Sequence, residues 1–385
     1  MSVKGALKKC ALAGGLVAAS TFGVWAWATG VRRRPTARDV RRILVIRLDL
    51  MGDVVFSLPA IELLAEQYPE ATVDVLVLPY TAPLLRGVAH VRRIHTLDVN
   101  QFRRPSGWRR AAELIACIRS LRAQRYDLAI GLSGLMGGVF AALSGARWRA
   151  GYAAETLPGC YNLRVPGRRY REAKHEVMYC VDLVRAIAGG PARDVAPRLS
   201  PATPERPPAS PYMVLVPGAN NGRAKRWPPA YWAALADALA TTSEGEIVLA
   251  GSESEGSLAR EIATLARCAI VNRAGQTSVD ELVSLLAGAR VVVAGDTGPL
   301  HVAAALGRPV VGIFGPTDPV NTGPLGSAST VVRLGLTCSP CYDLRSPADC
   351  KLPDRSTRCM WGLDPSTVEQ AVRNALATAP SAAHG

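Results

Sequence analysis

The chain has 385 residues, a length that accommodates two ordinary domains. Its hydrophobic fraction of 49% is ample for packed cores and excludes a disordered chain. The formal net charge of +14 favours polyanionic partners, but the sequence has neither zinc-finger spacing nor an aromatic–basic RNA motif, so nucleic acid is not expected.

The amino-terminal segment is the first predicted element. Residues 10–31 carry no charge and would extend about 33 Å as a helix, enough to cross a bilayer core. The heavier basic flank, three arginines at 32–34, follows the segment, so the positive-inside rule keeps the body of the chain in the cytoplasm. Residues 1–39 are therefore predicted to be a membrane-anchor segment. A cleaved export signal ending at Ala-Trp-Ala, 26–28, is the alternative.

Strand and helix signals then alternate through residues 40–195. Short β-branched runs predict buried parallel strands, and longer periodic runs predict helices. The strands are expected at 43–48, 72–78 and 127–132, and the helices at 54–67, interrupted early by Pro59, and at 107–124. This alternation predicts an α/β, doubly wound domain.

A proline-rich linker is expected at 196–211, because seven prolines lie between 191 and 211. A second α/β domain is then expected over 212–378. Its strands are predicted at 212–218, 246–252, 290–298 and 309–315, and its helices at 231–240, 279–289 and 299–307. Ligands of such sheets bind at the carboxyl ends of strands, so the expected site is a cleft between the two domains.

The stretch RLDLMGDVVFSLPA, Arg47 to Ala60, places an acidic residue, Asp53, where the predicted strand ends and the predicted helix begins. Acids are costly to bury, so Asp53 either caps the helix or takes part in chemistry. Asp49 lies nearer the strand and is interpreted as a structural acid.

The stretch VVVAGDTGPLHVAAALGRPVVGIFGPTDP, 291–319, predicts a strand, a tight turn and a helix. Free N–H groups at such a helix start bind anions; Gly298 permits close approach of a phosphate, and Thr297 offers a hydroxyl. Asp296 is interpreted either as a helix cap or as a ligand-binding acid. His301, one turn inside, is equally compatible with packing against the sheet.

These two stretches, with HEVMYCVDLV (175–184) and PGANNGRAKRWPPAYWAALADAL, resemble glycosyltransferase family 9, the ADP-heptose:lipopolysaccharide heptosyltransferases. The resemblance covers about residues 43–370. It implies the two-domain GT-B architecture and inverting sugar transfer from a nucleotide-activated donor.

The resemblance also implies roles for individual residues. Asp53 would be the general base, and Lys225, in the family's Lys-x-Trp-Pro pattern, would stabilise the leaving diphosphate. Without the resemblance, Lys225 would be interpreted as a surface lysine. Glu255 would bind the donor ribose, with Glu253 as a nearby competitor. The remaining donor-binding residues would be Asn220, Asn221, Asp296, Thr297, Gly298 and His301.

The implied partners are a nucleotide-sugar donor, first of all ADP-heptose, a glycolipid or lipopolysaccharide-type acceptor, and the inner membrane. No cofactor and no catalytic metal are expected, because no Asp-x-Asp clamp lies near the donor motif. The alternatives are a nucleotide-sugar-binding protein without transfer activity and a transferase using another nucleotide sugar. A dinucleotide-dependent oxidoreductase is disfavoured, since neither glycine-containing turn supplies G-x-G-x-x-G.

Two further features bear on the site. Gly131 and Ser133 lie where family members often carry an acid, which leaves acceptor recognition open. Cys338, Cys341, Cys350 and Cys359 have the spacing C-x2-C-x8-C-x8-C. Four thiolates of this kind can bind structural zinc, with reduced thiols or a disulfide as the alternatives.

Overall fold

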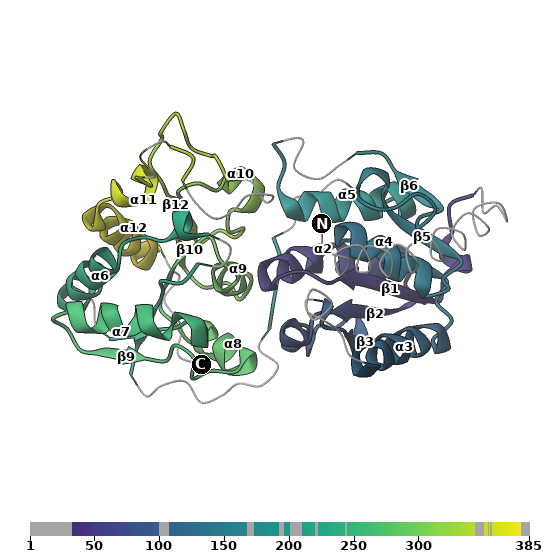
Figure 1. Cartoon of the computed structure of the whole chain (residues 1–385), viewed down its shortest axis with the longest axis horizontal. Coiled ribbons are helices and arrows are strands. Elements are labelled where there is room, and N and C mark those ends of the chain that lie inside the picture. Colours follow the sequence, from purple (N-terminus) through teal and green to yellow (C-terminus); the bar gives the residue numbers. More distant parts are fainter. Residues whose placement is uncertain are drawn as a thin grey trace, which may run out of the picture. The chain divides into compact units, whose positions relative to one another are not determined.

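The computed structural model describes residues 33–99, 108–167, 173–191, 196–200, 210–219, 222–242, 245–342, 350–352, 354 and 356–378. The chain divides into two compact units. Met1–Glu172 and Glu176–Val195 belong to the first unit, and Ala173–His175 and Ala196–Gly385 belong to the second. Each unit contains a parallel sheet with helices around it (Figure 1).

A six-stranded parallel sheet forms the centre of the first unit, in the order β3-β2-β1-β4-β5-β6. Its central strands are almost fully buried, as expected for a parallel sheet covered on both faces. The strands are β1 (Arg42–Arg47), β2 (Thr72–Val77), β3 (Val91–Thr96), β4 (Leu128–Gly131), β5 (Trp148–Tyr152) and β6 (Leu163–Val165).

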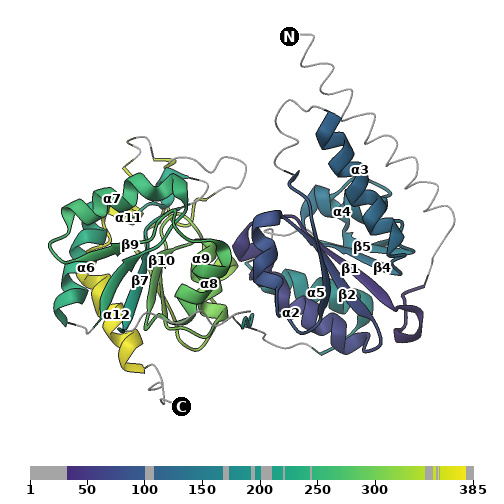
Figure 2. The same ribbon diagram turned by 90° about the horizontal axis from the view of Figure 1, so that it is seen from below.

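Two pairs of helices cover this sheet (Figure 2). Helices α2 (Met51–Gln67) and α5 (Glu176–Ala188) pack together, and α3 (Trp108–Ala123) and α4 (Gly134–Leu143) lie on the opposite face. Leu44 and Ile46 of β1 belong to one core cluster with Leu121 of α3 and Phe140 of α4. Because side chains alternate along a strand, Arg47 lies on the face covered by α2 and α5. Short 3-10 turns occupy Ala37–Asp39 (η1), Pro79–Leu85 (η2) and Ala153–Glu155 (η4).

The second unit repeats the arrangement with the strand order β12-β11-β10-β7-β8-β9, all parallel. The strands are β7 (Tyr212–Val216), β8 (Glu246–Leu249), β9 (Ile270–Asn272), β10 (Val292–Gly295), β11 (Val310–Ile313) and β12 (Ser329–Val332). The helices are α6 (Pro229–Thr242), α7 (Gly256–Leu265), α8 (Val279–Ala287), α9 (Gly298–Ala305), α10 (Pro319–Thr322), α11 (Arg358–Trp361) and α12 (Pro365–Thr378), with 3-10 turns η5 (Arg223–Lys225) and η6 (Glu253–Glu255).

The strand order reverses once in each sheet. In the first unit the chain runs outward from β1 to β3 and then restarts at β4 on the other side of β1. In the second unit the same reversal lies between β7 and β10. Connections after the two central strands diverge to opposite faces at such a point, and ligands bind there, beyond the carboxyl ends of the strands.

The predicted α/β class with two doubly wound sheets is confirmed. One helix boundary was wrong: α2 begins at Met51 instead of 54 and continues through Pro59 without interruption. The earlier start follows from the capping of its first turn by Asp53. The elements that were not predicted are mostly short or strongly polar: β3, β5, β6, β9, β12, α4, α7, α10, α11 and α12.

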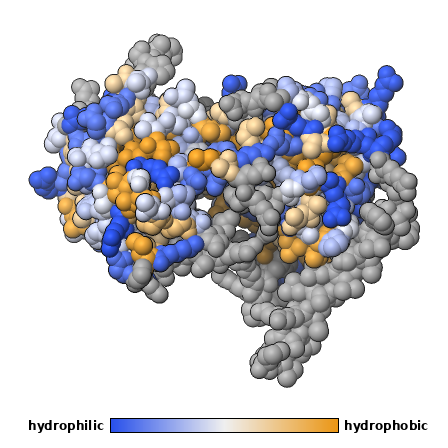
Figure 3. All heavy atoms as spheres, turned by 90° about the horizontal axis from the view of Figure 1, so that it is seen from above, coloured by the Kyte–Doolittle hydropathy of each residue, from blue (hydrophilic) through white to orange (hydrophobic). Residues whose placement is uncertain are grey.

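Within the ranges described above, no helix is long and apolar enough to span a membrane. The predicted anchor at 10–31 lies outside those ranges. On the face shown in Figure 3, hydrophilic and hydrophobic residues are interspersed over both units.

Candidate active site

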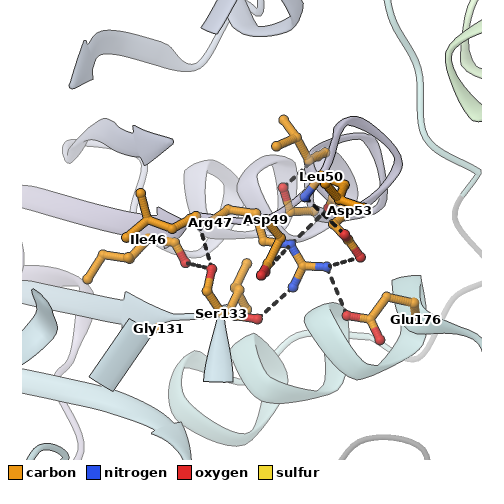
Figure 4. A network of polar contacts seen from close by, with 12 residues as sticks. Ile46, Arg47, Asp49, Leu50, Asp53, Gly131, Ser133 and Glu176 are labelled. Carbon is orange, nitrogen blue, oxygen red and sulfur yellow. Dashed lines mark hydrogen bonds and ion pairs between the residues drawn. The ribbon is translucent and has the colours of Figure 1, made fainter. Parts of the chain in front are cut away.

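A buried arginine organises the carboxyl edge of the first sheet. Arg47 is the last residue of β1, and its side chain is 1% exposed. Its Nη1 donates to the Leu132 carbonyl oxygen at 2.6 Å, and its Nη2 donates to Glu176 Oε1 at 2.9 Å. The same guanidinium donates to Asp53 twice, from Nε to the main-chain oxygen at 3.0 Å and from Nη2 to Oδ1 at 3.2 Å (Figure 4).

Asp53 is at once a capping residue and a partly accessible carboxylate. It is the third residue of α2, and its Oδ2 accepts a hydrogen bond from the Leu50 main-chain N–H at 3.2 Å. The side chain remains 28% exposed, beside the point where the strand order reverses. The two interpretations of Asp53 are therefore compatible, because a capping carboxylate retains lone pairs that can accept a proton.

Asp49 lies in the same turn but contacts Arg47 less closely. Its Oδ2 lies 3.5 Å from Arg47 Nε, and its side chain is 31% exposed. No other hydrogen-bond partner of this oxygen is present among the described residues. Asp49 therefore contributes negative charge to the edge, whereas Asp53 is held by both its main chain and its side chain.

The departure from the family pattern at Gly131 has a steric cause. The Tyr161 hydroxyl donates to the Gly131 carbonyl oxygen at 3.4 Å and occupies the space where a side chain at 131 would lie. A Cβ at Gly131 would also lie 2.7 Å from the Gly137 carbonyl carbon. Ser133 has a structural role, since its hydroxyl accepts from the Leu48 N–H at 2.6 Å and bridges β1 to β4. An acidic side chain therefore has no room at position 131.

The carboxyl edge of the second sheet holds a largely shielded ion pair, whose two side chains are 11% and 10% exposed. Asp296 follows β10, and its Oδ2 lies 3.4 Å from Lys225 Nζ while its Oδ1 lies 3.4 Å from His301 Nε2. The Thr322 hydroxyl donates to Oδ2 at 3.4 Å. Burial alone would raise the pKa of Asp296, but the charge on Lys225 and the hydrogen bond from His301 outweigh it and lower the pKa to about 2.

The segment that carries Lys225 is held in place by the buried side chain of Trp227. It ends the turn η5, two residues before Trp227, whose indole is 1% exposed and donates to the Leu363 carbonyl oxygen at 2.9 Å. Trp227 also packs edge-to-face on Trp232. The Lys225 ammonium lies 5.2 Å from the centre of the Tyr342 ring. The interpretation as a free surface lysine is wrong, because the side chain is only 11% exposed.

The start of α9 differs in detail from the sequence interpretation. Thr297, not Asp296, is the N-cap residue, and its hydroxyl donates to the Gly295 carbonyl oxygen at 3.3 Å. Gly298 and Pro299 form the first turn, and His301 is 5% exposed. The Asp296 carboxylate is therefore committed to Lys225 and His301 instead of capping the helix.

The two candidate glutamates lie in different places. Glu255 Oε2 accepts from the Ser252 N–H at 2.7 Å, and its carboxylate lies so close to Gly218 that a Cβ there would overlap it. Gly218 follows β7, so Glu255 lies at the edge where the strand order reverses. Glu253 instead lies against Gly275, beyond β9. Asn220 and Asn221 lie outside the described residues.

Sequence reasoning missed four residues around the expected site residues, three in direct contact with them and one, Glu176, in contact with Arg47. They are Arg47, Glu176, Thr322 and Tyr342. The only signals were an arginine at the end of an apolar strand and a glutamate opening the segment at 175–184.

The four carboxy-terminal cysteines at 338, 341, 350 and 359 are free thiols. Burial, with a smaller contribution from the other three sulfurs, raises the pKa of Cys359 to about 11. No group of three or more histidine, cysteine or acidic side chains in the described ranges is arranged to hold a metal ion. The zinc site therefore remains a prediction from the spacing. Metal analysis of the purified protein tests it, and a stoichiometry near zero would remove it.

We expect Asp296→Asn to lower the melting temperature in a pH-dependent way. The pKa of Asp296 is lowered to about 2 in the folded chain, against about 3.8 for an ordinary aspartate, so its charge stabilises the fold above about pH 4 and this contribution disappears as the pH falls toward 2. The gap in melting temperature between wild type and variant should be widest at pH 7 and narrow below pH 4. Glu246→Gln, at an exposed strand start, should show no such trend, and a pH-independent gap for Asp296→Asn would contradict the assignment.

Comparison with known proteins adds independent findings. The family model described as glycosyltransferase family 9 (heptosyltransferase) matches residues 114–352. Lipopolysaccharide heptosyltransferase 2 of Escherichia coli K12 is 30% identical over 313 residues, which cover 76% of this chain and 88% of that protein. Lipooligosaccharide heptosyltransferase 2 of Haemophilus ducreyi is 30% identical over 322 residues, with the same shares. The solved structure of E. coli ADP-heptose lps heptosyltransferase II has a TM-score of 0.70 and 27% identity, and the match covers 87% of this chain and 98% of that chain.

Proposed function

The chain belongs to glycosyltransferase family 9, the heptosyltransferases, and we propose that it transfers a heptose from an ADP-heptose donor to a lipopolysaccharide core acceptor. The observation that carries the proposal is the largely shielded Lys225–Asp296 pair at the switch point of the second sheet. A cation fixed at a strand edge beside a helix start suits the diphosphate of a nucleotide sugar. The GT-B fold agrees with this role, and relatives named for ADP-heptose transfer share it.

The proposed reaction is a direct displacement with inversion. Asp53 accepts the proton of an acceptor hydroxyl while the hydroxyl oxygen forms a bond to the anomeric carbon. The bond between that carbon and the diphosphate oxygen breaks, and ADP leaves with the electron pair. Lys225 stabilises the charge that develops on the leaving diphosphate. No step requires a metal ion, so a chelator should leave transfer unchanged.

Donor binding is proposed to involve residues on three segments of the second unit. The Gly298 N–H and the Thr297 hydroxyl at the start of α9 contact phosphate, and His301 supports Asp296 from inside the helix. Glu255 hydrogen-bonds the ribose from the end of β8. Asn220 and Asn221, which precede Lys225 in the sequence by five and four positions, are proposed to donate to phosphate on sequence grounds.

The substitution Gly218→Ala tests the Glu255 assignment. The new Cβ would overlap the Glu255 carboxylate and displace it. Losing one charge-assisted hydrogen bond costs about 1.5–3 kcal/mol, so ADP affinity should fall by about tenfold or more, measured by calorimetry. Gly335→Ala is the matched control, because no atom lies within 4 Å of its Cβ position. Unchanged ADP affinity in Gly218→Ala would remove Glu255 from the donor site.

Residues 10–31 are proposed, from the sequence alone, to anchor the protein at the cytoplasmic face of the inner membrane. Fractionation of cells expressing the full chain and a chain without residues 1–34 tests this. Release of the intact chain only by detergent supports an anchor, and a shortened, soluble periplasmic form contradicts it.

The proposed function is tested by incubating the full chain with ADP-heptose and a heptose-deficient lipopolysaccharide core, with and without EDTA. Mass spectrometry should detect one added heptose and an equal amount of ADP. Thermal shift with ADP-heptose and with a UDP-sugar identifies the donor. A higher melting temperature with ADP-heptose but no transfer product would favour a nucleotide-sugar-binding protein. A higher melting temperature with the UDP-sugar alone would show that the donor is a UDP-sugar and not ADP-heptose.

A further inference from the structure

We infer that Arg47 is a positioning residue for Asp53 and that the buried Glu176 is the counter-charge that makes this positioning compatible with proton transfer. The inference rests on the proposed function, in which Asp53 is the general base. It concerns two residues that lie in stretches resembling the family, but to which the resemblance assigns no role. It is carried by the contacts drawn in Figure 4.

The first step is geometric. Arg47 donates hydrogen bonds to both the main-chain oxygen and the Oδ1 of Asp53, at 3.0 and 3.2 Å. The guanidinium is itself fixed by the Leu132 carbonyl oxygen, which follows β4, and by Glu176, the first residue of α5. One planar group thus ties the first turn of α2 to the two strands of the switch point and to a neighbouring helix. A general base gains from such fixation, since misplacement by about 1 Å can cost about 10²-fold in rate.

The second step concerns charge. A directly paired arginine favours the ionised form of a carboxylate and so makes it a weaker proton acceptor. At this edge three carboxylates share the Arg47 charge, because Asp49, Asp53 and Glu176 all lie within 3.5 Å of its guanidinium. Glu176 is 0% exposed and lies 2.9 Å from Nη2, nearer than either aspartate. Glu176 therefore takes up part of the Arg47 charge together with Asp49, and its own negative charge makes Asp53 a better proton acceptor.

Several other titratable groups surround this edge. His175 directly precedes Glu176, and its Nε2 lies 2.9 Å from the Gly323 carbonyl oxygen. Burial disfavours the charged form of Arg47, but Cys180 and the three carboxylates outweigh it and raise its pKa well above the ordinary value, so it stays charged. Burial and the charge on Asp53 raise the pKa of Tyr80 to about 12. Burial, with Cys180 and nearby acids, raises the pKa of Tyr152 as well. Both tyrosines stay neutral below pH 10.

The experiment measures transfer by the full chain between pH 5 and 10, using ADP-heptose and the core acceptor. Arg47→Met should lower kcat by about 10²-fold with the donor KM within twofold of wild type. Glu176→Gln keeps the shape but removes the charge, so the acidic limb of the kcat/KM profile should move to lower pH by about one unit. Arg149→Met is the matched control: Arg149 is also buried, and within the described ranges its guanidinium donates to the carbonyl oxygens of Cys160 and Ala146 and to no carboxylate.

The outcomes separate this inference from the proposed function. Loss of transfer in Asp53→Asn together with wild-type kcat and pH profile in Arg47→Met and Glu176→Gln would overturn the inference alone. Normal transfer in Asp53→Asn would overturn this inference together with the general-base role of Asp53, whereas no transfer by the wild-type chain would overturn the proposed function. If Arg47→Met does not fold, the double variant Arg47→Met/Glu176→Met is measured in its place. It removes both buried charges, and replacing a whole buried ion pair by apolar residues is often neutral or stabilising. Wild-type kcat in that double variant would also overturn the inference.

Discussion

The Asp53→Asn variant is expected to transfer heptose about 10³-fold more slowly than wild type while binding ADP with unchanged affinity. An amide cannot accept the acceptor's proton, and general-base catalysis contributes about 10²–10⁴-fold. Asp53 belongs to the first unit and the proposed donor residues belong to the second, so donor binding has no reason to change. Steady-state kinetics and calorimetry with ADP measure the two quantities.

The control for this prediction must separate catalysis from helix capping. Asp39 is the third residue of η1, and its Oδ2 accepts from the Thr36 main-chain N–H at 2.9 Å, as Asp53 Oδ2 accepts from the Leu50 N–H at the start of α2. Asp39→Asn therefore weakens a comparable hydrogen bond to a main-chain N–H. Because Asp39 precedes β1 and lies at the amino edge of the sheet, opposite the carboxyl edge that holds Asp53, its kcat should equal that of wild type. A wild-type transfer rate in Asp53→Asn would show that Asp53 only caps α2 and does not act as the general base.

Replacement of Lys225 by Gln should reduce kcat by about 10²-fold and weaken ADP binding. The ammonium is held 3.4 Å from Asp296 and is 11% exposed, so its charge acts in a site partly shielded from water. Loss of one preorganised group that stabilises developing charge costs about 10²–10³-fold. Single-turnover rates separate the chemical step from donor binding.

Arg226→Gln is the neighbouring control, because Arg226 is exposed and its side chain lies outside the shielded pair. Its kcat should remain within about twofold of wild type. Equal kcat values for Lys225→Gln and Arg226→Gln would contradict the proposal that Lys225 stabilises the leaving diphosphate.

The sequence was most informative where the site is local. Asp296, Thr297, Gly298 and His301 lie within one strand–turn–helix unit, so their proximity followed from the order of elements. Lys225 was placed only through the resemblance, because its partner Asp296 lies on another strand connection. The family relationship and the α/β fold are confirmed.

The sequence was least informative where contacts join distant segments. Arg47 and Glu176 are 129 positions apart, and nothing in the spacing of either segment predicts that they meet. Thr322, 26 positions from Asp296, is another such contact. The Gly131 side of the site was also unpredictable, because the hydroxyl that excludes a side chain there comes from Tyr161, thirty positions later.

That last feature constrains how this edge can evolve. Tyr161 fills the space above two glycines on adjacent strands, Gly131 of β4 and Gly151 of β5, and a Cβ at either position would collide with its ring or hydroxyl. A Cβ at 131 would also lie 2.7 Å from the Gly137 carbonyl carbon, so an acid at 131 requires both a smaller residue at 161 and a shift of α4. Positions 131, 151 and 161 are therefore constrained together, and a substitution at one of them depends on the residues at the other two.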